Sequence, residues 1–382
     1  MPPALSRELV GIVGGCVIVG MSSLWLWKRH KASQPTVTVI GDIFCDVIAT
    51  SLRQLPSVWG TDTVISTPIT VQSGGSGLNT AVWLNSVIAA HALKKPPTVQ
   101  ISINFREDGE FESLVRDKLS DSGVVQIAPI DSSESAVGTC ICLSGETDRS
   151  FVTYRGGNEK FGFSDYNFED LVTQNQQHVH IAGYYNCPGL WGDKAVRFIG
   201  EARTKNPSLR VSLNPQYGQD WGGDIRKILS VIDFFICNSV EAQGIASIGL
   251  DKSLDIIESG IRLVKELNCP CAIITMGSDG ALVVRKGLFQ GEGMTEFPEA
   301  GVSLQRVLCK EILDSPIMDT VGVGDAFCGG FLAQVVEKRL NAASPELIEA
   351  VRFGCACGTA ALTVVGGSTF PGLSKVHECM ID

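Results

Sequence analysis

The sequence has a shortage of positive charge. Its 382 residues carry 31 lysines and arginines against 41 aspartates and glutamates, which gives a formal net charge of −10. A nucleic-acid partner needs a basic surface that neutralises phosphates, so this composition argues against one. Charged residues make up only 19% of the chain and apolar residues 44%, which is typical of a globular protein with a large core.

Several common catalytic motifs are also absent. The sequence has no GxxxxGK[S/T], no HRD with DFG, no GxSxG and no HExxH. It therefore lacks the minimum parts of Walker-type nucleoside triphosphatases, protein kinases, common serine hydrolases and zincins. No CxxC pair occurs among the 13 cysteines, which lie in apolar runs. We expect buried, reduced thiols rather than a zinc site, and hence a reducing compartment.

An apolar run without charge extends from Leu9 to Trp27, and Lys28-Arg29-His30-Lys31 follows it. About 20 such residues span a bilayer, so we expect a short tail over 1–8 and a single-pass transmembrane helix over 9–27. The basic flank places the remaining chain in the cytosol. We therefore expect a single-pass membrane protein whose globular part faces the cytosol. A cleaved signal peptide is the alternative, but its basic residues precede the apolar run.

After a basic flank and linker over 28–36, residues 37–382 have the pattern of one α/β domain. Short β-branched runs alternate with stretches of helical spacing. This alternation predicts a doubly wound, mostly parallel sheet with helices on both faces and ligands at the carboxyl ends of the strands. Strands near 63–71 and 137–154 predict a small β lid. Unpaired edges of such a lid suggest a homodimer.

Two glycine turns each lead into an apolar run with helical spacing, at Gly74-Gly75-Ser76-Gly77 and at Gly322-Val323-Gly324. The N–H groups of such a turn and of the following helix converge and attract an anion. A carboxylate at this place, Asp325, is costly unless it has a task such as accepting a proton. The second turn therefore predicts a phosphoryl-transfer site. The structural alternative is a loop that Asp325 caps.

Four segments follow one another in the order Gly74–Ala81, Asn238–Glu241, Thr275–Gly280 and Asp319–Asp325. In this order, on an α/β pattern, they resemble the signatures of the ribokinase-like (PfkB) carbohydrate kinase family over about residues 37–372. The resemblance implies a ribokinase-like fold and a phosphotransferase with an alcohol acceptor. Such an enzyme uses ATP and Mg²⁺ to phosphorylate a hydroxyl, here expected to be a hydroxymethyl group of a sugar.

The resemblance also implies roles for individual residues. The implied catalytic residues are Asp325 as general base and, as an anion hole, Gly322, Val323 and Gly324. The implied substrate residues are Asp46, Gly74, Gly75 and Asn79. The implied nucleotide residues are Asn238, Glu241, Thr275, Gly277, Ser278 and Gly280. The implied metal sites are Glu241 for Mg²⁺ through water and, for a monovalent cation such as K⁺, Asp319, Val321, Ala361 and Gly366.

Structural alternatives exist for the nucleotide residues. Asn238-Ser-Val-Glu241 has the spacing of a helix capping box, which we favour for this segment in isolation. Thr275–Gly280 equally fits an ordinary turn between strands.

Three positions depart from the pattern of ribokinases themselves: Ser76 replaces a lysine, Phe44 an asparagine and Gly183 an acidic sugar ligand. These differences weaken a ribose assignment. The segment Gly183-Tyr-Tyr185 resembles the nucleoside-kinase branch, so an adenosine-like substrate is the alternative. The non-enzyme alternative is a catalytically silent, membrane-anchored binding protein, against which Asp325 and both glycine turns argue.

Overall fold

The computed structural model describes residues 35–52, 59–60, 62–102, 105–106, 108–127, 135–145, 149–163, 172, 175–291, 293–310 and 317–381. The predicted transmembrane range, 9–27, lies outside these residues.

The prediction of a membrane-spanning helix is corrected by the structure. None of the helices in the described ranges is long and apolar enough to cross a membrane. The longest of them, α9 (Val323–Lys338), has 16 residues. At a rise of about 1.5 Å per residue it covers roughly 24 Å, which is short of the apolar layer of a bilayer. The single-pass anchor, the membrane partner and the membrane location that we derived from the sequence are therefore not supported.

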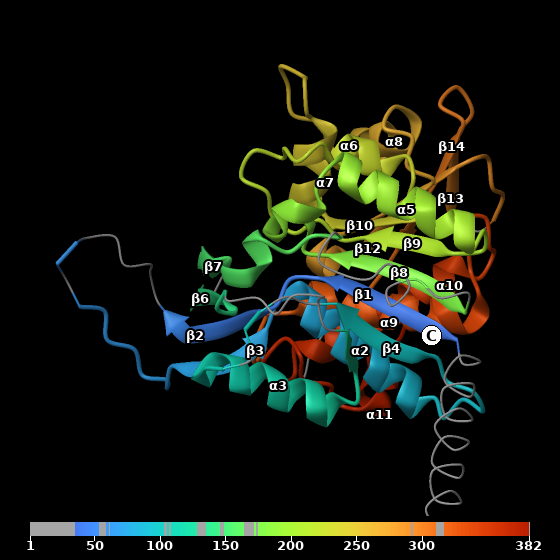
Figure 1. Cartoon of the computed structure of the whole chain (residues 1–382). Helices are drawn as coiled ribbons and strands as arrows, with labels where there is room; N and C mark the ends of the chain where they lie inside the picture. Colours follow the sequence, from blue (N-terminus) through green and yellow to red (C-terminus); the bar gives the residue numbers. More distant parts are fainter. Residues whose placement is uncertain are drawn as a thin grey trace, which may run out of the picture.

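The main sheet has ten strands in the order β13-β14-β12-β11-β10-β9-β8-β1-β4-β5 (Figure 1). Their bounds are β1 Thr36–Gly41, β4 Thr98–Ser102, β5 Val125–Ile127, β8 Gln176–Ala182, β9 Arg210–Leu213, β10 Phe234–Asn238, β11 Cys271–Thr275, β12 Ala281–Lys286, β13 Met294–Phe297 and β14 Val302–Val307. Strands from β5 to β11 pair in parallel, whereas β12, β13 and β14 pair antiparallel. The predicted α/β sheet is confirmed, as a mixed sheet.

Helices cover both faces of this sheet (Figure 1). One core contains Val37 and Val39 of β1, together with apolar residues of α2 (Ser76–Ala90), α9 and α10 (Leu347–Ala361). The other core contains Ile40. Its helices are α5 (Asp193–Lys205), α6 (Ile225–Leu229), α7 (Ser239–Ala246) and α8 (Ile256–Lys265). The side chains of β1 alternate between two buried faces, as expected for a strand at the centre of a double layer.

Small residues allow α2 and α9 to pack closely. A Cβ atom on Gly329 of α9 would lie 2.5 Å from the Cβ atom of Trp83 on α2. The same holds between α9 and α10, because a Cβ atom on Gly330 would lie 2.4 Å from Sγ of Cys357. The N-termini of α2 and α9 each follow one of the two glycine turns, so this packing also fixes the distance between the turns.

A second sheet of four strands, in the order β3-β2-β6-β7, forms the lid. Strands β6 (Gly138–Gly145) and β7 (Arg149–Tyr154) form the predicted hairpin. The other lid strands differ from the prediction, because residues 62–69 form no strand, whereas β3 covers Thr70–Gly74 and β2 covers Phe44–Leu52. Pro68, which cannot donate to a ladder, lies in the strand-free part. A homodimer through this lid stays a prediction.

Smaller elements complete the described chain. They are α3 (Glu110–Ser122), α11 (Leu373–Glu378) and the 3₁₀ turns η1 (Gly156–Glu159), η3 (Tyr184–Asn186), η4 (Pro188–Leu190) and η5 (Gly277–Asp279). The cysteines in the described ranges are free, and all of them except Cys309 are buried.

Candidate active site

The carboxylate of Asp325 lies in the first turn of α9 and is 5% exposed. Oγ of Ser76 donates a hydrogen bond of 2.8 Å to Oδ1, and Nδ2 of Asn79 donates one of 2.9 Å to Oδ2. Nε2 of Gln216 lies 3.4 Å from Oδ1. The glycine turn before α2 and the glycine turn before α9 thus meet at this acid.

Burial raises the pKa of Asp325 above the ordinary value of 3.8, and the hydrogen bonds from Asn79 and Ser76 oppose that rise. A carboxylate with a raised pKa holds a proton more strongly and is therefore a better proton acceptor. Both hydrogen bonds also fix the orientation of the carboxylate. The site has the geometry of a positioned general base.

Gly322 gives the turn before α9 its shape. Its φ of 75° lies in the left-handed region, and an added Cβ atom would lie 2.3 Å from Cα of Gly367. A side chain is therefore excluded both by conformation and by space. Val323 and Gly324 are the first residues of the helix, and the first N–H groups of a helix have no partner within it. These amides lie beside Asp325 and are available to an anion.

The turn before α2 packs against the segment between β1 and β2. An added Cβ atom on Gly74 would lie 1.8 Å from Oδ2 of Asp46, and one on Gly75 would lie 2.8 Å from Cα of Ile43. Both glycines are therefore needed for close approach. Asp46 is 8% exposed, and its carboxylate has no hydrogen bond to another described residue. Burial, followed by the charges of Asp42 and Asp325, raises its pKa to about 7.

Asp42 is a second buried acid at this place. Its Oδ1 accepts a hydrogen bond of 2.9 Å from the amide of Gly77, and its Oδ2 accepts one from Nδ2 of Asn186. Burial raises its pKa to about 7 in spite of these bonds. An added Cβ atom on Gly183 would lie 2.3 Å from this carboxylate, so the absence of a side chain at residue 183 makes room for Asp42.

Asn238 and Glu241 form the capping box at the start of α7. The amide of Glu241 donates to Oδ1 of Asn238, and the amide and Nδ2 of Asn238 donate to the two carboxylate oxygens of Glu241. Glu241 is 4% exposed, and burial raises its pKa to about 7. The structural alternative that we favoured for this segment in isolation is therefore observed.

The nucleotide residues of the third motif lie beside this capping box. In the register of β10 and β11, Asn238 pairs with Thr275. Gly277 and Ser278 belong to η5, the turn that joins β11 to the antiparallel strand β12. Gly280 has a φ of 84°, and an added Cβ atom would lie 2.0 Å from the carbonyl oxygen of Val307. The motif is thus a hairpin turn at the same edge of the sheet as Asn238.

Each carboxylate oxygen of Glu241 accepts one hydrogen bond and keeps a second lone pair. No cluster of three or more His, Cys, Asp or Glu side chains that could hold a metal ion occurs in the described part of the chain. The free lone pairs of Glu241 could accept hydrogen bonds from the waters of a bound Mg²⁺, an ion that keeps several of its own waters.

The residues expected around a monovalent cation come together in part. Oδ1 of Asp319 accepts a bond of 2.9 Å from the amide of Val321, and Oδ2 accepts one of 3.0 Å from the amide of Gly366. The carbonyl of Ala361 accepts a bond from the amide of Val364. Asp319 thus joins the two loops, and the cation itself stays a prediction.

Three polar side chains at this site had no assigned role in the sequence-based prediction. Ser76 was noted only as a departure from a lysine, although it bonds to Asp325. Gln216 has a φ of 58° and follows β9 at the carboxyl end of the sheet. Ligands gather at this end, so its position after a strand could have marked Gln216 as a site residue. Asn186 lies in η3 after β8 and contacts Asp42.

A family model described as "pfkB family carbohydrate kinase" matches residues 34–373 of the chain. The chain belongs to this family. It is thus a phosphotransferase with an alcohol acceptor and one of the kinases that act on sugars or nucleosides. The resemblance inferred from the four motifs is confirmed.

Among curated relatives, the chain is 24% identical to an adenosine kinase of Dictyostelium discoideum, over 59% of this chain and 63% of that protein. It is 24% identical to an adenosine kinase of Schizophyllum commune, over 71% of this chain and 75% of that protein. The solved structure of a ribokinase from Giardia lamblia aligns with a TM-score of 0.71 at 22% identity, over 90% of this chain and 99% of that chain. The structural match shows the fold and the family model shows the family, whereas the acceptor stays open.

Proposed function

We propose that the protein transfers the γ-phosphate of ATP to a hydroxymethyl group of a sugar, with Asp325 as the general base. The observation that carries this proposal is the Asp325 carboxylate, which is buried, held by Ser76 and Asn79, and placed at the N-terminus of α9. A substrate hydroxyl at this carboxylate would give up its proton as its oxygen attacks the γ-phosphorus. General-base catalysis of this kind contributes about 10²–10⁴-fold.

The anion hole in this proposal consists of the amides of Gly322, Val323, Gly324 and Asp325. They would stabilise the charge that develops on the transferred phosphoryl group, and the dipole of α9 would add to their effect. Phosphoryl transfer depends mainly on positioning and on such electrostatic stabilisation, so the site needs no protein nucleophile.

The sugar would lie between Asp325 and Asp46. The Asp46 carboxylate is nearly buried and has no hydrogen-bond partner among the described residues, so a sugar hydroxyl would satisfy it. Gly74 and Gly75 would let the sugar approach the backbone, and the amide of Asn79, besides holding Asp325, would border the same pocket.

The nucleotide would lie along Thr275, Gly277, Ser278 and Gly280, and Glu241 would contact its Mg²⁺ through water. A structure of a ribokinase from Arabidopsis thaliana, described as complexed with ribose and ATP, aligns with a TM-score of 0.64 at 18% identity over 90% of this chain and 98% of that chain. That complex supports ATP as the phosphate donor.

A nucleoside is the second candidate substrate, because aromatic side chains lie near Gln216. Tyr217 is 66% exposed, and its ring lies 5.3 Å from that of Trp221 at an interplanar angle of 73°. Trp221 also contacts the ring of Tyr185. An exposed aromatic ring beside a residue that contacts Asp325 could stack on a purine base.

A measurement of ADP release separates these substrates. The full-length chain is given ATP, Mg²⁺ and, in turn, a panel of pentoses, hexoses and nucleosides. We expect turnover with at least one free sugar and at least about a hundredfold less with the Asp325→Asn protein. Turnover with adenosine-like compounds alone would replace the sugar by a nucleoside. Equal rates for the variant and the wild type would remove Asp325 as the base.

A further inference from the structure

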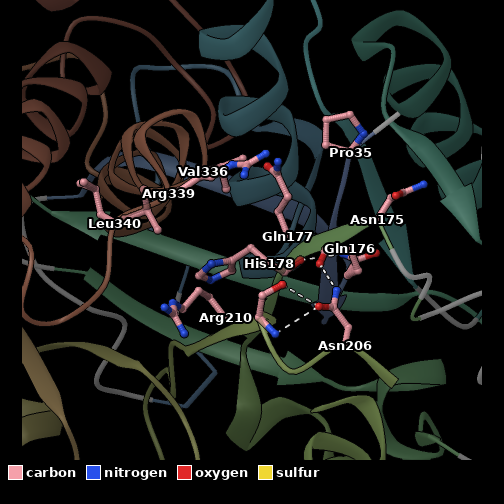
Figure 2. A pocket seen from close by; sticks show the side chains of 12 residues that line it. Pro35, Asn175, Gln176, Gln177, His178, Asn206, Arg210, Val336, Arg339 and Leu340 are labelled. Atoms are coloured by element: carbon pink, nitrogen blue, oxygen red, sulfur yellow. Dashed lines mark hydrogen bonds between the residues drawn. The ribbon is translucent and has the colours of Figure 1, made fainter. Parts of the chain in front are cut away.

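A cavity of about 440 Å³ lies at the amino ends of the central strands. Asp325 belongs to the first turn of α9, whereas the cavity is at the other end of that helix. Figure 2 shows the side chains that line the cavity. The beginnings of β8 and β9 and the C-terminal end of α9 form its walls. Cavities of a few hundred cubic ångströms accommodate small molecules. Neither the kinase motifs nor the roles proposed above use any residue of this cavity.

The charge of the cavity is opposite to that of the whole chain. The described residues that line it include two arginines, Arg210 and Arg339, and no carboxylate, although the chain carries a net charge of −10. Arg339 has no hydrogen bond or ion pair from its guanidinium to any described residue. A guanidinium without a partner is a strong binding group for phosphate or carboxylate.

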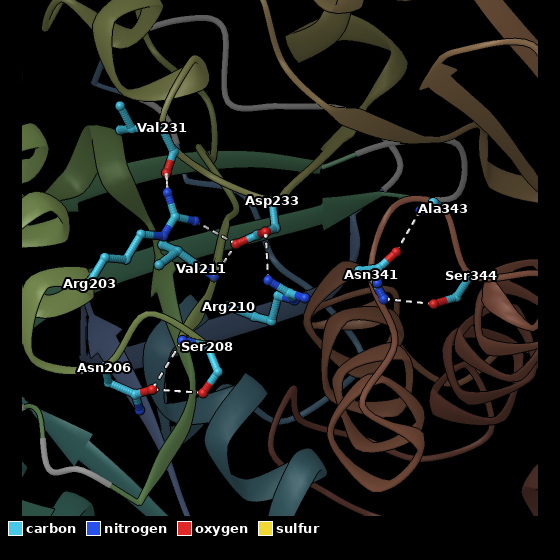
Figure 3. Close-up of polar contacts among 10 residues, drawn as sticks. All are labelled: Arg203, Asn206, Ser208, Arg210, Val211, Val231, Asp233, Asn341, Ala343 and Ser344. Atoms are coloured by element: carbon cyan, nitrogen blue, oxygen red, sulfur yellow. Dashed lines mark hydrogen bonds and ion pairs between the residues drawn. The ribbon is translucent and has the colours of Figure 1, made fainter.

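Arg210 is only partly neutralised by its neighbour Asp233. Nη1 of Arg210 lies 3.7 Å from Oδ1 of Asp233. The same carboxylate accepts a shorter bond of 2.7 Å from Nη2 of Arg203, which does not line the cavity (Figure 3). The single carboxylate of Asp233 therefore neutralises two guanidinium groups only in part, and net positive charge remains on Arg210 at the cavity.

The polar part of the lining is fixed by hydrogen bonds (Figure 2). Nδ2 of Asn206 donates to the carbonyl of Gln176 at 2.6 Å, and Nε2 of Gln176 donates to the carbonyl of His178 at 2.7 Å. Oγ of Ser208 donates to Oδ1 of Asn206 at 2.7 Å. A wall held in this way loses little conformational entropy when a ligand binds.

One buried ring nitrogen at the cavity lacks a partner. His178 is 1% exposed, and its Nε2 lies 2.7 Å from Oγ of Ser212, whereas its Nδ1 has no hydrogen bond within the described structure. Burial lowers the pKa of His178 to about 3, so the ring is neutral. Because Ser212 also contacts Nδ1 of His180, the tautomer can present Nδ1 of His178 as donor or acceptor. This nitrogen is buried behind the surface of the cavity.

From these observations we infer that the cavity binds a small organic phosphate. The phosphate lies between Arg210 and Arg339, and hydroxyl groups of the ligand face the polar side chains of the lining. The carbon skeleton packs on Val335 and Val336, which are buried apolar residues of α9 in the lining. This site is separate from the active site, because the 16 residues of α9 place about 24 Å between its two ends.

Titration calorimetry of the full-length chain tests this inference with ribose 5-phosphate, fructose 6-phosphate, AMP and inorganic phosphate as probes. We expect at least one organic phosphate to bind in a step that Arg210→Gln and Arg339→Gln each weaken at least about tenfold. Ribose without phosphate should not compete. Arg197→Gln, which removes an exposed arginine of α5, is the matched control and should leave the affinity unchanged.

Active-site binding is distinguished by repeating the titration with Asp325→Asn and with the nucleotide site saturated by a non-hydrolysable ATP analogue. The step that depends on Arg339 should persist in both cases, and turnover of Arg339→Gln should equal that of the wild type if the fold is intact. Absence of any arginine-dependent step for all probes overturns the inference. So does a step that disappears when the active site is filled.

Discussion

Replacing Ser76 by alanine should move the acid limb of the pH–rate profile to higher pH. Ser76 donates a hydrogen bond of 2.8 Å to Oδ1 of Asp325, and both side chains are buried. That bond lowers the pKa of Asp325 and opposes the larger effect of burial. A hydrogen bond to a charged group contributes about 1.5–3 kcal/mol, and a pKa difference of one corresponds to about 1.36 kcal/mol. Loss of the bond should therefore raise the pKa of Asp325 further, because the carboxylate form loses a donor while burial still disfavours it.

The sign of the effect follows from the proposed role of Asp325 as general base. Asp325 accepts a proton only when it is deprotonated, so a higher pKa removes active enzyme from the low-pH side of the profile. Below the new pKa, kcat/KM should fall about tenfold for each decrease of one pH unit. At high pH most of the rate should return. Recovery at high pH separates this effect from damage to the fold, which lowers the rate at every pH.

The assay is ADP release by wild type and variant between about pH 5 and 9, with the acceptor that the substrate panel identifies. The profile of kcat/KM reports the pKa of the free enzyme. Ser86→Ala is the matched control, since Ser86 lies on the same helix and has no hydrogen bond from its hydroxyl to the described chain. An unchanged acid limb in Ser76→Ala would show that Ser76 does not tune the base.

Three further predictions concern the same site. Asp325→Asn should keep nucleotide binding, measured by calorimetry, and lose about 10²–10⁴-fold in kcat. Gly322→Ala should lower the melting temperature and the turnover together, because its Cβ atom would lie 2.3 Å from Cα of Gly367 and its φ of 75° suits glycine. Stability in urea should fall as the pH rises from about 4 to about 7, since burial raises the pKa of Asp42 and Asp46 from 3.8 to about 7. Asp42→Asn should make that fall shallower.

The two glycine turns could be predicted from the sequence because their causes are local. A glycine pair before an apolar run with helical spacing predicts a turn and a helix N-terminus without any distant residue. The meeting of the turns could not be predicted in this way. Asn79 and Asp325 are separated by 246 positions, and their contact depends on the packing of α2 against α9. Only the order of the motifs, through the resemblance to a family, connected them.

The errors have physical reasons as well. An apolar run without charge, such as 9–27, has the composition of a membrane span, and composition alone does not establish a helix. Residues 63–69 alternate like a strand, but strand pairing in the lid begins only at Thr70.

The position of Asp46 gives the lid a part in the proposed reaction. The structure places Asp46 on β2 of the lid sheet, paired with Gln72 of β3 and Cys140 of β6. Asp325 belongs to α9, which packs on the main sheet, so the two carboxylates come from different layers of the fold. The charge of Asp325 contributes to the raised pKa of Asp46. A hydroxylated substrate between them would bond to Asp46 and separate the two charges, so sugar binding and lid position should be coupled through this one acid.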